Sequence, residues 1–160
     1  MNNILSSRLV GSRQSNQELT FRRAEISFFI HATEDGKKLL EGISMRLDVP
    51  MEMFEQKKGD GHFGNPIQIT KVHLGHAESE ALIKNIVRGL GIGERVILAK
   101  EVDSHLDADG NLYLRLDKQE LILGKLILGA KDPIRIKVKI NSSSRGRGFI
   151  VLACQRLLLE

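Results

Sequence analysis

The stretch Ile134-Arg-Ile-Lys-Val-Lys-Ile140 alternates strictly between apolar and basic residues. Successive side chains of a β-strand point to opposite faces, so a period of two predicts a strand with one buried and one solvated face. A sheet that is solvated on one side is typical of antiparallel strands. The stretch therefore predicts an antiparallel sheet whose apolar face is covered by another part of the chain.

A second strand shows the same alternation nearer the N-terminus. Its apolar positions are Ala24, Ile26, Phe28 and Ile30. Its other positions are Glu25, Ser27, Phe29 and His31. The pattern begins only near Phe21, because the residues before it are polar and unpatterned, so we expect the folded domain to begin there.

Helical periodicity appears in the segments that would cover the sheet. Thr33 is expected to cap a helix whose apolar stripe is Leu40, Ile43 and Leu47 and which ends at Pro50. Two further helices are expected. They cover residues 77–90 and residues 94–106.

Loops and the remaining strands complete the expected order. Residues 57–66 hold three glycines and one proline and predict a loop, from which a strand leaves at Ile67. After the turn at Asp107, three strands are expected, over residues 111–118, 121–128 and 134–140. Strands joined by short turns pair antiparallel, so the class is α+β, with an antiparallel sheet and helices packed on one face.

Charge is unevenly placed along the chain. Residues 1–23 carry four arginines against one glutamate, and residues 131–160 carry seven lysines and arginines against two acids, although the net charge of the whole chain is only +4. Basic ends of this kind attract a polyanion, but simple solvated tails have the same composition. We expect three parts: a flexible segment (1–20), an α+β domain (21–140), and a basic linker with an apolar C-terminal segment packed on that domain (141–160).

Composition also bears on compartment. The single cysteine, Cys154, cannot form an intramolecular disulfide, and the apolar run around it favours a buried structural thiol. No run approaches the ~18 apolar residues of a membrane span, and no apolar signal segment follows the N-terminal methionine. We therefore expect a cytoplasmic protein without a membrane partner.

Signatures of catalysis are missing from the sequence. His73 and His76 have a ligand-like spacing but no accompanying cysteine or carboxylate signature. A calcium loop begun at Asp107 would need glycine where Leu112 stands. No Gly-x-Ser-x-Gly, Walker lysine or complete dinucleotide loop occurs. We expect no catalytic residue, no metal and no cofactor, and a metal-dependent hydrolase that uses these histidines and His62 has the least support.

The polar face of the last strand gives the positive signal for function. Arg135, Lys137 and Lys139 project from one side of the last strand. Tyr113, Arg115 and Asp117 project together from an earlier strand. If the two strands are neighbours, they form a basic stripe with one aromatic beside it, which can neutralise phosphates and stack on a base. A charged, solvated sheet face shows the same pattern, and the residues alone leave both interpretations open.

Three stretches together resemble a known family. They are Ala24-Glu-Ile-Ser-Phe-Phe-Ile-His-Ala-Thr-Glu-Asp35, Gly61-His-Phe-Gly-Asn-Pro-Ile67, and Leu112-Tyr-Leu-Arg-Leu-Asp-Lys-Gln119 followed by Asp132-Pro-Ile-Arg-Ile-Lys-Val-Lys139. They are similar to the archaeal RNA-binding family described as predicted exosome subunits, over residues 21–140. The resemblance implies a fold similar to that of the ribosomal protein that binds 5S RNA, a role beside the exosome or ribosome, and no catalytic residues.

The resemblance adds candidate residues to those of the stripe. His62 and Asn65 lie in a glycine-flanked loop, and Lys118 and Gln119 are expected to end a strand, although each has an ordinary structural explanation. The expected RNA-binding residues are Arg115, Lys118, Arg135, Lys137, Lys139, His62 and Asn65. We therefore expect a non-catalytic RNA-binding accessory protein with exosome or ribosomal proteins as partners. The alternative is a protein-interaction module of an RNA-processing assembly that does not contact RNA itself.

Overall fold

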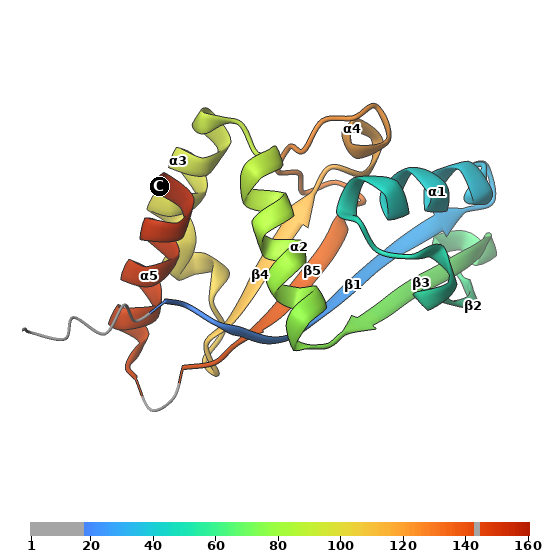
Figure 1. Ribbon diagram of the computed structural model, residues 1–160. Helices are drawn as coiled ribbons and strands as arrows, with labels where there is room; N and C mark the ends of the chain where they lie inside the picture. The colour runs from blue at the N-terminus through green and yellow to red at the C-terminus, as the bar shows by residue number, and fades with distance from the viewer. Residues whose placement is uncertain (1–17, 143–144) are drawn as a thin grey trace, which may run out of the picture.

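The computed structural model describes residues 18–142 and 145–160. Within them, five strands form one antiparallel sheet in the order β2-β3-β1-β5-β4, shown in Figure 1. The strands are β1 (Phe21–His31), β2 (Glu55–Asp60), β3 (Pro66–Leu74), β4 (Asn111–Leu116) and β5 (Ile134–Ile140). The longest strand, β1, is central, so β5 from the end of the domain and β3 from its middle both pair with it.

Helices cover one face of this sheet. They are α1 (Gly36–Leu47), α2 (His76–Gly89), α3 (Ile92–Glu101), α4 (Lys118–Ile122) and α5 (Arg147–Leu159). In Figure 1, α1 and α2 lie in front of the sheet, and α3 and α5 lie side by side at the left. The fold class expected from the sequence, α+β with an antiparallel sheet and helices on one face, is confirmed.

The core lies between the sheet and these helices. Ile26 of β1 and Ile136 of β5 are paired in register and are both 0% exposed. Ile43 of α1 and Ile86 of α2 are buried against the same face. Burial of each such side chain contributes roughly 1.5–3 kcal/mol, so the alternation of the strands fixes which face receives the helices.

The first helix begins later than expected. Its N-cap is Asp35, whose carboxylate accepts a hydrogen bond from the backbone N–H of Lys38 at 3.2 Å, and Thr33 lies outside the helix. The buried stripe consequently includes Leu39, and Leu40 is only partly buried. Aspartate and threonine both cap helices well, so the sequence alone did not separate the two positions.

Residues 57–66 are wrongly assigned as a loop by the sequence. Residues 57–60 belong to β2, which pairs with β3. The hairpin turn between the two strands is confined to residues 61–65. Strand β2 lies at the edge of the sheet, and most of its side chains are exposed. An edge strand of this kind needs no apolar alternation, which is why the pattern gave no signal.

The strand expected over residues 121–128 is also wrong. Residues 118–122 form α4, where the carboxylate of Asp117 accepts a hydrogen bond from the backbone N–H of Glu120 at 2.9 Å. Gly124, at φ 96°, follows this short helix, and the next residues form only isolated bridges such as Leu116–Leu128. Local capping therefore overrides the strand propensity of a short apolar run.

The remaining expectations concern the two ends of the chain. The expected flexible segment, 1–20, falls largely on residues 1–17, which lie outside the described residues. The apolar C-terminal segment forms α5, which packs beside α3 and buries Ile150, Cys154 and Leu158.

The helix expected over 94–106 is shorter, because α3 gives way to a 3-10 turn at Val102. None of the helices described is long and apolar enough to cross a membrane.

Candidate nucleic-acid interface

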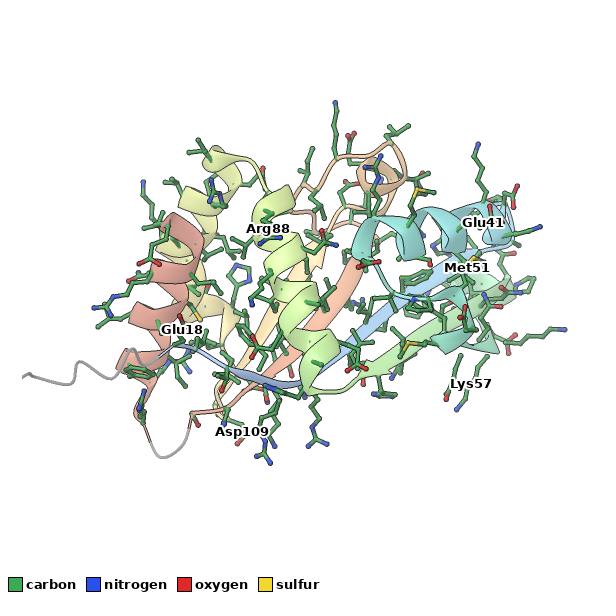
Figure 2. The ribbon with its side chains drawn as sticks, in the orientation of Figure 1. Glu18, Glu41, Met51, Lys57, Arg88 and Asp109 are labelled. Carbon is green, nitrogen blue, oxygen red and sulfur yellow. The ribbon has the colours of Figure 1, made fainter. Side chains whose placement is uncertain are left out.

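The sheet surface opposite the helices, called the open face below, carries the candidate interface. Its central part comes from β1, β5 and β4. These residues are Arg23, Glu25, Ser27, Phe29, His31, Arg135, Lys137, Lys139, Tyr113 and Arg115. The rest comes from β3 and β2. These residues are Ile67, Ile69, Lys71, His73, Glu55, Lys57 and Gly59. Figure 2 shows Glu41 on α1 and Arg88 on α2, on the helices that cover the other face.

Four cations of the open face form the basic stripe: Arg115, Arg135, Lys137 and Lys139. Arg115 lies directly opposite Arg135, and Tyr113 lies opposite Lys137, in the β4–β5 register. Within the described part of the chain, none of the four forms an ion pair with a carboxylate. Like charges placed directly across a pair of strands are destabilising, so this arrangement is suited to a bound anion.

Two aromatic rings lie beside the basic stripe. The guanidinium carbon of Arg135 lies 5.4 Å from the centroid of the Phe29 ring, and Nζ of Lys137 lies 5.4 Å from that of Tyr113. Both distances fall within the range of cation–π contacts. Tyr113 also raises the pKa of Lys137 above its ordinary value and so favours the charged ammonium.

The acidic side chains of the open face lie outside the basic stripe, at Glu25 on β1 and Glu55 on β2. The carboxylate of Glu25 lies between two side chains of β3. Its Oε1 is 3.3 Å from Nζ of Lys71, and its Oε2 is 3.5 Å from Nδ1 of His73. These contacts partly neutralise the charge where β1 meets β3. Positive charge is therefore most concentrated over β5 and β4, where the sequence placed the stripe, and Arg23 of β1 lies directly opposite Lys139 and adds to it.

Lys118 does not lie on the open face. It is 1% exposed, and its ammonium donates to the carbonyl oxygen of Phe29 at 2.8 Å, to Glu34 Oε2 at 3.0 Å and to Asp132 Oδ2 at 2.5 Å. An ammonium has three donor hydrogens, and three acceptors surround this one. The expected position at an exposed strand end is wrong, because Lys118 is the first residue of α4 and is drawn inward by two carboxylates.

The same cluster brings together a set of metal-ligating types. One ligand atom each of His31, Glu34 and Asp132 lies within 4.8 Å of the others, and His31 Nε2 lies 2.9 Å from Asp132 Oδ2. The ammonium of Lys118 already lies against both carboxylates. The cluster is therefore a network of internal ion pairs in which a lysine supplies the cation.

The histidines considered as metal ligands have separate partners. His73 faces Glu25 on the open face, whereas Nδ1 of His76 lies 2.7 Å from the carbonyl oxygen of Phe21. His62 lies elsewhere, in the β2–β3 hairpin turn. The structure does not bring the three together.

The hairpin turn between β2 and β3 holds the other two predicted residues. His62 and Asn65 are exposed there, and the backbone carbonyl of Asn65 accepts a hydrogen bond from the N–H of Gly61 at 2.7 Å. The turn joins β2 and β3 at one edge of the sheet, and β3 and β1 lie between these strands and the strands of the basic stripe. His62 and Asn65 are therefore separated from the stripe. Between them Phe63 is 91% exposed, with φ at 67°.

Sequence reasoning missed the part played by Phe29. The alternation of β1 already put this residue on the polar side of the strand, which was a usable signal. Its neighbours could not be inferred, because the contact with Arg135 depends on the register between β1 and β5. The open face therefore has two aromatics beside its cations.

Comparison with known proteins agrees with this arrangement. The model of a protein family described as RNA binding matches residues 23–140. This chain belongs to that RNA-binding family. The match includes the whole basic stripe and nearly all of the sheet, and it ends before α5 begins. The resemblance found in the sequence to an archaeal RNA-binding family is thereby confirmed.

Individual relatives of the RNA-binding family are archaeal. RNA-binding protein PAB1135 of Pyrococcus abyssi is 29% identical over 150 residues, which is 88% of this chain and 96% of the relative. Among solved structures, protein AF2318 of Archaeoglobus fulgidus superposes with a TM-score of 0.73 at 28% identity, covering 86% of this chain and 99% of that one. Protein SSO0741 of Sulfolobus solfataricus superposes with a TM-score of 0.65 at 30% identity, covering 84% of this chain and 98% of that one. Both structures are described as DUF54 proteins.

Proposed function

We propose that this protein is a non-catalytic RNA-binding protein that holds the RNA backbone on the basic stripe of its open face. The observation that carries the proposal is the set of four cations on adjacent strands, none in an ion pair within the described residues. The RNA-binding name of the Pyrococcus abyssi relative supports the same partner.

The length of the basic stripe suits contact with several phosphates. Arg135, Lys137 and Lys139 are spaced two residues apart on β5, so they extend over roughly 13 Å along the strand. Arg115 adds a second row on β4. Cations arranged in this way bind phosphates without reading base sequence, and such binding releases counterions and depends strongly on salt.

The proposal is tested by removing charge from the open face and, separately, from the helices. The test variant carries Arg135→Ala, Lys137→Ala and Lys139→Ala. The control carries Lys38→Ala, Lys84→Ala and Arg88→Ala, three exposed cations of α1 and α2. RNA affinity is measured for both at several salt concentrations.

Comparison of the two variants distinguishes binding at the basic stripe from attraction by the overall positive charge. We expect the slope of log K against log salt to fall by about 2 in the test variant, since each lost phosphate contact on a single strand contributes about 0.7. The control should keep the slope of the unmodified protein. Equal behaviour of the two variants would show that the basic stripe is not the binding surface.

Absence of catalysis is part of the proposal and has its own test. End-labelled RNA is incubated with saturating protein, with and without Mg²⁺, and its length is followed on a denaturing gel. The RNA should be recovered at full length under both conditions. Shortening that increases with protein concentration, and persists in a second, independently purified preparation, would contradict a purely binding role.

An accessory role beside the archaeal exosome or ribosome is the setting that the family resemblance supports. Purification of the full chain from archaeal cells, with and without nuclease treatment, tests it. We expect exosome or ribosomal proteins to be recovered and to be lost after nuclease treatment, because RNA would link them. Recovery that resists nuclease, together with no direct RNA binding, would favour a protein-interaction module.

A further inference from the structure

An apolar area adjoins the basic stripe on the open face. It consists of Phe29 on β1 and of Ile67 and Ile69 on β3, and it is called the platform below. Phe29 and Ile69 are paired in register, and Ile67 follows on the same face. All three are only partly buried, and none belongs to the apolar core that the described helices cover. The platform therefore presents apolar surface on the side of the sheet that has no helix.

Glycines of β2 and of its turn keep one edge of the platform free of side chains. A Cβ atom at Gly59 would lie 3.2 Å from Ile69 Cδ1, and one at Gly61 would lie 3.0 Å both from Ile67 Cγ2 and from the carbonyl oxygen of Asn65. Each position thus faces the platform, and any side chain there would crowd it. Glycine in a strand often marks a place that another group approaches closely.

The backbone of Phe29 is anchored by a hydrogen bond at the edge of the platform. Its carbonyl oxygen accepts a hydrogen bond from the buried ammonium of Lys118, which is itself fixed by Glu34 and Asp132. The guanidinium of Arg135 lies 5.4 Å from the centroid of its ring. A backbone that is anchored before binding loses less conformational freedom when a ligand stacks on its side chain.

We infer that the platform binds unpaired bases of an RNA whose phosphates lie along the basic stripe. The inference rests on the proposed function and deepens it, since it names RNA with a single-stranded segment as the ligand. The face of a base is flat and largely apolar and is joined through its sugar to phosphates. The platform is apolar and adjoins cations that form no ion pair within the described residues. Arg135 of the basic stripe lies 5.4 Å from the ring centroid of Phe29 in the platform, so one nucleotide can contact both surfaces. In a duplex the base faces are stacked and cannot reach the platform.

Two labelled RNAs of the same sequence provide the test. One is single-stranded, the other is paired with its complement, and both carry 2-aminopurine, whose fluorescence reports stacking. We expect tighter binding of the single strand and a fluorescence change on binding. Phe29→Leu should weaken single-strand binding by about five-fold or more and leave duplex binding unchanged. Phe29→Tyr, which keeps an aromatic ring, should retain the affinity.

A second variant guards against a folding defect in the first. Gly59→Val introduces a side chain that suits a strand and covers the platform from β2, and it should also weaken single-strand binding by several-fold. Circular dichroism and thermal unfolding establish that each variant is folded. Leu152→Ala, which changes an exposed leucine of α5, is the matched control and should bind as the unmodified protein does.

The outcomes separate this inference from the proposed function. Equal affinity for single strand and duplex, unaffected by Phe29→Leu and Gly59→Val, would overturn the platform and leave the basic stripe standing. Failure to bind either RNA would overturn the proposed function itself. Unchanged RNA affinity in folded variants that lose a partner protein would assign the platform to that protein instead.

Discussion

The ammonium of Lys118 donates a hydrogen bond of 2.8 Å to the carbonyl oxygen of Phe29, 89 residues earlier in the chain. The same nitrogen lies against the carboxylates of Glu34 and Asp132. One buried cation thus joins the first turn of α4 to the end of β1, to the loop after it and to the segment that enters β5. All of these meet beside Arg135 and the platform, so the geometry of the candidate interface depends on a residue that is not exposed on it.

Replacement of Lys118 should therefore destabilise the fold. Lys118→Met fills a similar volume but leaves Glu34 and Asp132 without their cation, and loss of one partner of a buried ion pair costs about 3–5 kcal/mol. Urea unfolding followed by circular dichroism measures the change. Lys84→Met, at an exposed position of α2, should change stability by no more than about 0.5 kcal/mol. Similar values for the two variants would contradict a structural role for Lys118.

Much of the sheet was predictable because its signal is local. The alternation of residues 134–140 correctly assigned Arg135, Lys137 and Lys139 to one face, since the period of a strand needs no knowledge of its neighbours. Placement of Arg115 beside them required only that β4 pair with β5, which the structure shows. The four cations of the basic stripe were thus available from the sequence.

The wrong predictions concern residues whose structure depends on distant contacts, on a place at the edge of the sheet or on a helix cap. In the sequence, Lys118 resembles an ordinary polar residue after a strand. Its burial depends on contacts with Glu34 and Asp132, which are 84 and 14 residues away in the chain. The edge strand β2 has almost no buried side chain, so it has no period to detect. The apolar run after Lys118 favours a strand until the cap supplied by Asp117 is considered.

Asp107 provides a prediction for acidic pH. The side chain of Asn111 donates to Asp107 Oδ2 at 2.8 Å and lowers the pKa of Asp107, with smaller contributions from the Asn111 backbone and the Tyr113 hydroxyl. A carboxyl whose pKa is depressed by folding adds stability above its ordinary pKa, and this is lost as the pH falls through the folded value. NMR titration should show Asp107 titrating below its ordinary range.

A variant of its main partner checks the cause. Asn111→Ala should move the Asp107 pKa back upward, and Tyr113→Phe, which removes only a smaller contribution, should move it less. If Asp107 of the unmodified protein already titrates in the ordinary range, the hydrogen bonds of this turn are not formed in solution.

Cys154 should be unreactive in the folded protein. Burial raises the pKa of its thiol to about 12, so almost none is present as thiolate near neutral pH, and the thiolate is the reactive form. Reaction with Ellman's reagent at pH 8 should be slow in native protein and immediate in guanidinium chloride. Rapid stoichiometric reaction of the native protein would show that α5 does not remain packed on the domain.

The central claim, that the open face binds RNA, is tested most directly by the ring of Tyr113, the single tyrosine of the chain. Its NMR signals need no further assignment and report from the middle of the basic stripe. On titration with single-stranded RNA, the account predicts that the Tyr113 signals shift while the methyl signals of Ile92 and Ile97, exposed on α3, stay in place. Shifts at Ile92 and Ile97 with an unchanged Tyr113 would contradict it.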